Sequence, residues 1–255
     1  MCYYQIIGMK LLPIIVPLRC PVREAAVPFG RAICPSCYRQ LPFVGSCTCY
    51  SCGKPVSDPG QEYCYDCRVF SKSFLGGCSL LIYDRMTQPA MVRFKYHNQR
   101  VLADFFSDEI LRRYRSLFRS WKINAVVPVP IHRIKYKKRG YNQAALLSSR
   151  IAYGLGLSHI SDLLIRKVNT LPQKQFGSQA RLANLTDAFS FNKQYSGDVS
   201  SIGRLLLVDD IYTTGATMEA CTRVLNRAGI KDVYICSVCT GLSRDSQDDS
   251  PYNTT

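Results

Sequence analysis

Two adjacent carboxylates, Asp209 and Asp210, follow a short apolar run at Leu205 to Val208 that is long enough for one buried strand. Such a pair accepts hydrogen bonds from vicinal hydroxyls and suits Mg²⁺. A threonine-rich turn around Gly215 comes next, and from Met218 onward the apolar residues recur at helical spacing. Unpaired backbone N–H groups at a helix N-terminus bind phosphate, and glycine lets the backbone approach it closely. The order predicts a site for a ligand with a phosphate beside a diol.

The segment from Arg204 to Thr217 resembles the 5-phosphoribosyl 1-diphosphate (PRPP) binding motif of the type I phosphoribosyltransferases. The resemblance implies that the acidic pair holds the ribose hydroxyls and that the following loop wraps the 5′-phosphate. We therefore assign these residues to PRPP binding: Asp209, Asp210, Ile211, Tyr212, Thr213, Thr214, Gly215, Ala216 and Thr217. One alternative is an ordinary α/β turn capped by Asp and Thr. The other is the acidic strand of an ATPase, which the lack of a G-x-x-x-x-G-K-[ST] loop in the sequence excludes.

Four cysteines in the first third of the chain form two C-x-x-C pairs, Cys49 with Cys52 and Cys64 with Cys67. Eleven residues separate the pairs, and Gly53 follows the first of them. This is the pattern of a zinc ribbon, in which two knuckle turns offer four thiolates to one tetrahedral ion. The alternative is a set of reduced structural cysteines. The spacing predicts a structural Zn²⁺ site.

A third pair, Cys34 and Cys37, has an incomplete upstream partner. Only Cys20 stands there, with Arg23 in the place of a second cysteine. Either Cys20 and a nearby residue such as Cys47 complete a second zinc site, or that site is degraded.

The elements that must position these groups alternate between strand and helix patterns. We expect strands at Cys78 to Tyr83, Ala125 to Val129, Leu205 to Val208 and Asp232 to Cys239, and helices at Gln99 to Phe118, Leu146 to Leu155 and Met218 to Ala228. In a parallel α/β sheet, ligands bind at the loops that leave the carboxyl ends of the strands. The acidic turn and a basic loop at residues 132–139 both occupy such positions.

The formal net charge of +15 is concentrated between Arg93 and Arg150. An anionic ligand suits this excess: a pyrophosphate, a nucleotide or a nucleic-acid backbone. The candidate contacts are Lys95, Arg133, Lys135, Lys137, Lys138 and Arg139. A solvated basic helix face is the alternative for the stretch from Arg112 to Arg119.

The polar stretch from Leu163 to Phe189 reads as a loop that closes over a reactive ligand and excludes water. Its lid candidates are Arg166, Gln173 and Arg181. A plain surface connection is the alternative.

Taken together, these motifs resemble the ComF family of double-zinc-ribbon, phosphoribosyltransferase-like proteins linked to competence for DNA uptake. Besides the cysteine pairs and the PRPP motif, the matching residues are Leu12-Pro13, Lys95-Tyr96, Pro128-Val-Pro130, Arg139-Gly-Tyr-Asn-Gln143, Arg166, Thr170, Gln173, Arg181, Asn184 and Ala188-Phe189. The resemblance implies an α/β fold, a type I phosphoribosyltransferase-like parallel sheet with flanking helices and a flexible hood, preceded by a small zinc-ribbon domain. We expect the ribbon at residues 1–75, the phosphoribosyltransferase-like domain at 76–241 and a polar tail at 242–255.

The same resemblance implies a function. PRPP binds with Mg²⁺, and phosphoribose passes to an unidentified acceptor in a protein of natural competence, with Asp209 and Asp210 as catalytic residues. One alternative is a non-catalytic module that binds single-stranded DNA or docks a DNA-uptake helicase, and another is a nucleotide-salvage phosphoribosyltransferase.

The apolar stretch from Ile6 to Leu18 contains Lys10 and two prolines. We therefore expect neither a signal peptide nor a membrane span, and a cytoplasmic location.

Overall fold

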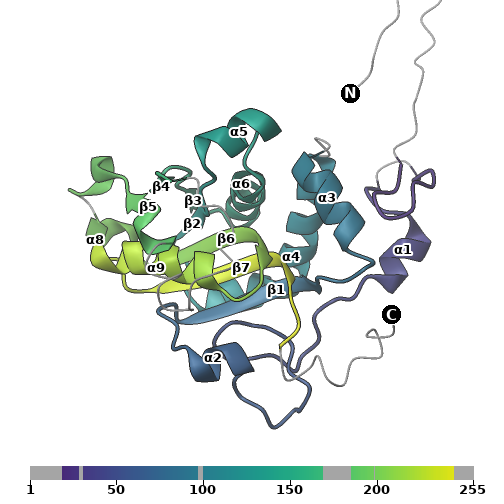
Figure 1. Ribbon diagram of the computed structural model, residues 1–255, viewed down its shortest axis with the longest axis horizontal. Coiled ribbons are helices and arrows are strands. Elements are labelled where there is room, and N and C mark those ends of the chain that lie inside the picture. The colour runs from purple at the N-terminus through teal and green to yellow at the C-terminus, as the bar shows by residue number, and fades with distance from the viewer. Residues whose placement is uncertain (1–18, 29–30, 97–99, 169–184, 198, 244–255) are drawn as a thin grey trace, which may run out of the picture.

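The computed structural model describes residues 19–28, 31–96, 100–168, 185–197 and 199–243 (Figure 1). Its centre is a five-stranded parallel sheet in the order β1-β7-β6-β2-β3. The strands are β1 (Gly76–Ile82), β2 (Ala125–Pro128), β3 (Ser158–His159), β6 (Leu205–Tyr212) and β7 (Val233–Thr240). The predicted α/β class and parallel sheet are confirmed.

Helices cover both faces of the sheet, which explains why its long strands are apolar along nearly their whole length. One face packs against α3 (Gln88–Tyr96), α4 (Val101–Ser120) and α6 (Gln143–Leu155), and the other against α9 (Ala216–Arg227). Side chains of β6 alternate between the two cores: Leu206 and Val208 join the first, and Leu205 and Leu207 join the second.

Strand β6 runs farther than the sequence pattern predicted. We expected it to end at Val208, but it continues through the acidic pair to Tyr212 because β7 still pairs with it, Asp209 opposite Ser237 and Ile211 opposite Cys239. On the other side, β2 pairs with β6 only as far as Val208 and then leaves the sheet at its prolines. The acidic pair therefore lies in extended backbone with one edge unpaired.

The basic segment after β2 is a helix and not the loop that we expected. Helix α5 (Arg133–Arg139) begins at His132, whose side chain accepts a hydrogen bond from the backbone N–H of Ile134. It ends at Gly140, which has φ +76° in the left-handed region. These two caps stabilise a helix of seven residues despite its five cationic side chains.

A small antiparallel pair, β4 (Leu164–Arg166) with β5 (Phe189–Phe191), stands beside the main sheet. Two short helices follow β5 along the chain, η1 (Lys193–Tyr195) and α8 (Val199–Ile202). Strands β4 and β5 lie at the two ends of the segment from Leu163 to Phe189 that we expected to form the hood. No helix among the described residues is long and apolar enough to cross a membrane.

The cysteine-rich part of the chain lies against the main sheet and contributes to both of its cores. It contains α1 (Pro35–Gln40) and α2 (Tyr65–Val69), which lie at separate places beside the sheet (Figure 1). Cys20, Cys34 and Cys37 pack in the core on the α4 side, and Cys49, Cys52 and Cys64 pack in the core on the α9 side.

Candidate functional site

The acidic pair lies at the carboxyl end of β6, with one carboxylate on each side of the strand. Asp210 forms an ion pair with Lys95 in the last turn of α3, with 3.1 Å between Nζ and Oδ1. Asp209 accepts a hydrogen bond from the backbone N–H of Asp210 at 2.8 Å, and it interacts electrostatically with Arg166 of β4. The strand thus holds two carboxylates between two cations.

The pKa of Asp209 is raised to about 7, mainly by burial and then by the charge of Asp210. The backbone N–H of Asp210 and the charges of Lys95 and Arg166 oppose this shift but do not cancel it. In the absence of a ligand, Asp209 is therefore partly protonated near neutral pH.

A cavity of about 1010 Å³ opens over the acidic pair at the carboxyl edge of the sheet. Its lining comes from β6, α3, α5, α6, β4, the start of α9 and the segments after β1 and β2. The residues are Tyr83, Lys95, Val129, Pro130, Ile131, Lys135, Arg139, Asn142, Gln143, Ala144, Arg166, Asp209, Asp210, Ile211, Thr213 and Thr217. The edge of the sheet that sequence reasoning selected is therefore where the cavity lies.

Cations line the wall opposite the acidic pair. Lys135 has a lowered pKa, first because it is partly buried and then because Arg166 and Arg139 lie near it. Arg139 donates to Oε1 of Gln143 at 3.1 Å, and its guanidinium lies over the ring of Tyr96. Crowded, partly buried cations of this kind favour a bound polyanion, which would relieve their mutual repulsion.

The basic residues that we selected as candidates fall into two groups in the structure, those that line the cavity and those that are exposed outside it. Lys95, Lys135 and Arg139 line the cavity, whereas Arg133, Lys137 and Lys138 of α5 are exposed and are not part of its lining. Of the lid candidates, Arg166 lines the cavity. Gln173 and Arg181 lie outside the described residues.

The loop after β6 leads directly into the N-terminus of α9. Gly215 caps this helix with φ +77°, and its carbonyl accepts from the backbone N–H of Glu219 at 2.8 Å. Thr213 and Thr217 face the cavity on either side of the glycine. A helix N-terminus reached through a left-handed glycine is a common phosphate-binding arrangement.

Tyr212 differs from the role that the sequence predicted for it. We assigned it to the ligand, but its side chain is 2% exposed and is not part of the cavity lining. Alternation along β6 would place Tyr212 on the side of Leu206 and Val208, but at this last residue of the strand the side chain lies in the other core, with Leu205 and Leu207. The ring instead packs edge-on against Phe74 from the cysteine-rich part of the chain, with 6.5 Å between ring centroids.

Tyr83 and Asn142 line the cavity although sequence reasoning gave neither of them a role at the site. Asn142 donates to the carbonyl of Val129 at 3.0 Å and caps α6. Its place in the Arg139-to-Gln143 motif was a signal that we could have used. Tyr83 follows β1, and no sequence motif marks it as a residue of the site.

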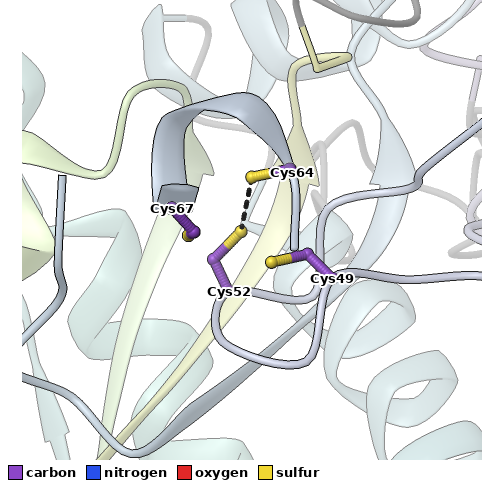
Figure 2. Close-up of side chains that lie close together, drawn as sticks. All are labelled: Cys49, Cys52, Cys64 and Cys67. Carbon is purple, nitrogen blue, oxygen red and sulfur yellow. Dashed lines mark hydrogen bonds between the residues drawn. The ribbon is translucent and has the colours of Figure 1, made fainter. Parts of the chain in front are cut away.

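Four cysteines form one metal-binding group. The sulfur atoms of Cys49, Cys52, Cys64 and Cys67 lie within 4.8 Å of one another, and Figure 2 shows them converging from two turns of the chain. The Cys52 and Cys64 sulfurs are 3.6 Å apart. Zinc–sulfur bonds of about 2.3 Å in a tetrahedron place sulfurs roughly 3.8 Å apart, so the group fits a structural zinc ion.

Cys20, Cys34 and Cys37 form a second group of buried thiols within 4.8 Å of one another. Cys47 is exposed and does not belong to this group. Three thiol ligands are therefore in place at this second site, and within the described residues no fourth cysteine, histidine or carboxylate joins them.

Comparison with known families finds both parts of this architecture. Residues 11–68 match the double zinc ribbon domain, and residues 161–255 match the phosphoribosyl transferase domain. Fold and site thus define a zinc-ribbon protein with a phosphoribosyltransferase-type domain.

Two curated relatives match this chain over most of their length. Competence protein F of Haemophilus influenzae is 28% identical over 220 residues, which cover 80% of this chain and 88% of that protein. Competence protein ComFC of Bacillus subtilis is 26% identical over 203 residues, which cover 77% of this chain and 79% of that protein. The chain is thus similar to the ComF competence proteins over most of its length.

Among solved structures, the adenine phosphoribosyltransferase of Saccharomyces cerevisiae matches 64% of this chain and 78% of its own. The identity is 17% and the TM-score is 0.35.

Proposed function

We propose that this chain binds PRPP together with Mg²⁺ in the cavity at the carboxyl edge of its sheet, as a protein of natural competence. One observation carries the proposal: a carboxylate pair, a glycine loop at a helix N-terminus and a cationic wall all line one cavity. The acidic pair accepts hydrogen bonds from the ribose hydroxyls, and the loop of Thr213 to Thr217 binds the 5′-phosphate. Lys135 and Arg139 face the diphosphate. The names of the relatives, which refer to competence and DNA utilization, support the biological role.

The reaction that suits this site is displacement of pyrophosphate from C1 of the ribose. A lone pair of the acceptor forms the new bond to C1, and the electron pair of the breaking C1–O bond leaves with pyrophosphate. Lys135 and Arg139 stabilise the departing charge, while Asp209 and Asp210 orient the ribose and Asp210 takes the acceptor's proton. Mg²⁺, when bound, neutralises part of the diphosphate charge.

Calorimetric titration with PRPP and Mg²⁺ tests the binding site. The double variant Asp209→Asn, Asp210→Asn should bind PRPP at least about tenfold more weakly, because two charged acceptors for the diol are replaced by amides. Asp162→Asn is the matched control, since Asp162 is a surface carboxylate that accepts from Tyr195 and does not line the cavity. Unchanged binding by the double variant would refute the proposed ribose site.

The same titration has an expected pH dependence. The ribose hydroxyls donate to ionised Asp209, whose pKa of about 7 means that binding at lower pH must first remove a proton. Affinity should therefore rise with pH up to about 7, by as much as about tenfold per unit, and then level off. In Asp209→Asn, any change of affinity with pH that remains is due to titration of the phosphates of PRPP itself.

The outer face of α5 favours a second function, contact with single-stranded DNA. It presents Arg133, Lys137 and Lys138 to solvent beside the exposed side chains of Ile134 and Tyr136. Cations interleaved with an aromatic ring suit a nucleic-acid backbone and its bases. Binding of a single-stranded oligonucleotide should weaken steeply with salt and should weaken again in Lys137→Ala, Lys138→Ala. An oligonucleotide that fails to bind even at low salt excludes this function.

A further inference from the structure

The side chain of Tyr212 lies between the four-cysteine group and the loop that caps α9. It is the last residue of β6, so its backbone belongs to the strand that carries the acidic pair. Phe74 packs edge-on against its ring, and the ammonium of Lys54 lies 5.7 Å from the ring centroid. Both of these neighbours come from the cysteine-rich part of the chain. The tyrosine thus connects the ribbon to the end of the central strand.

The hydroxyl of Tyr212 has no hydrogen-bond partner of good geometry within the described residues, although it is fully buried. The thiols of Cys52, Cys64 and Cys67 lie around it and interact with it electrostatically. A buried hydroxyl without a partner is rare in folded proteins and calls for an explanation. A metal-bound thiolate supplies one, because it carries negative charge and accepts a hydrogen bond that a neutral thiol accepts only weakly.

On its other side, the same hydroxyl supports the glycine of the loop. A Cβ atom added to Gly215 would lie 2.3 Å from the Tyr212 hydroxyl oxygen and 2.6 Å from the ring carbon that bears it. The left-handed turn at Gly215 therefore rests directly on the tyrosine. A shift of the ring must move the glycine, and with it the first turn of α9.

The segment that follows α2 contacts this same turn. Lys72 donates to the carbonyl of Thr214 at 3.3 Å. Ser73 donates to the buried carboxylate of Glu219 twice, from its backbone N–H and from its hydroxyl, each at 2.7 Å. The ribbon thus holds the start of α9 through polar contacts as well as through Tyr212.

We propose that Tyr212 is a positioning residue that couples the four-cysteine metal site to the phosphate loop. Its hydroxyl donates to the Cys52 thiolate of the metal-loaded site, and this hydrogen bond fixes the ring on which Gly215 rests. This coupling depends on the proposed function in one respect only, the identity of the ligand that the loop binds. The metal site therefore orders the loop from the side away from the cavity and contributes no group to the cavity itself.

Cobalt(II) substituted for zinc in the full-length protein tests this coupling without PRPP, so that its outcome does not depend on the proposed function. The thiolate-to-cobalt charge-transfer band reports the bonding of the thiolates, and a Cys34→Ser, Cys37→Ser background leaves only one thiol in the three-thiol group. Tyr212→Phe should move this band and lower cobalt affinity by about tenfold, the lower end of the loss typical of a ligand's supporting partner. Gly215→Ala should also move the band, because its methyl group displaces the Tyr212 ring.

The control is Tyr195→Phe, which removes a tyrosine hydroxyl that donates to Asp162 on the surface. It should leave both the band and the cobalt affinity unchanged, and circular dichroism should show all variants folded. A wild-type band and affinity in Tyr212→Phe would overturn the hydrogen bond to the thiolate. A wild-type band in Gly215→Ala would overturn the coupling to the loop, whatever Tyr212→Phe shows.

Discussion

Replacing Gly215 by alanine should weaken PRPP binding by about 30-fold or more, because strain at a positive φ and an overpacked neighbour together cost at least about 2 kcal/mol. The glycine has φ +77°, and the added methyl group would meet the Tyr212 hydroxyl oxygen at 2.3 Å. The tyrosine is buried against Phe74 and cannot swing away freely. The loop itself must therefore move, and with it the N–H groups that face the phosphate. Calorimetry with PRPP and Mg²⁺ measures the loss.

Gly140→Ala is the matched control for this substitution. Gly140 has φ +76°, nearly the same strained backbone, but nothing lies within 4 Å of the position that its Cβ would take. Alanine there carries the cost of the backbone conformation without the clash, at a site outside the phosphate loop. If the two variants bound PRPP equally well, the support of Gly215 by Tyr212 would have no part in ligand binding.

The second large effect should follow from the loss of one ligand of the four-cysteine site. Cys52→Ser should lower the melting temperature by about 10 °C or more, since loss of about 4 kcal/mol corresponds to that shift in a chain of this size. The effect should reach the whole fold because the Cys52 turn packs backbone against backbone on β1. A Cβ at Gly53 would lie 2.4 Å from the carbonyl oxygen of Gly77, and one at Gly77 would lie 2.7 Å from that of Cys52.

Differential scanning calorimetry of the zinc-loaded protein measures this shift. Cys47→Ser is the control, since Cys47 is exposed and lies in neither group of converging thiols. It should melt like the wild type, and a chelator should lower the melting temperature of the wild type toward that of Cys52→Ser. Equal melting of Cys52→Ser and Cys47→Ser would contradict a structural role for the metal.

Local patterns predicted most of the fold because its strands are short apolar runs and its helices have clear amphipathic spacing. The four main strands lie within a few residues of their predicted positions. The errors arose where neighbours in space decide the outcome. Strand β6 continues past Val208 because β7 pairs with it. Helix α5 forms in a strongly basic segment because His132 and Gly140 cap it.

The candidate site was predictable where its functional residues lie close together in the sequence. The acidic pair, the glycine loop and the Cys49-to-Cys67 group needed only spacing. The direction of the Tyr212 side chain did not follow from the motif, because it depends on a ribbon that packs beneath the loop. The cavity-facing subset of the basic residues also depends on packing, since neighbouring positions of α5 point to different sides of a helix.

The most direct test of PRPP recognition is a calorimetric comparison of three ligands on the wild-type protein with Mg²⁺: PRPP, ribose 5-phosphate and pyrophosphate. The loop and the acidic pair meet one end of PRPP, and Lys135 and Arg139 line the wall that faces the other. PRPP should bind at least about tenfold more tightly than either fragment, because one ligand then engages both ends of the cavity. Failure of PRPP to bind, or binding no tighter than that of ribose 5-phosphate, would exclude PRPP as the ligand of this cavity.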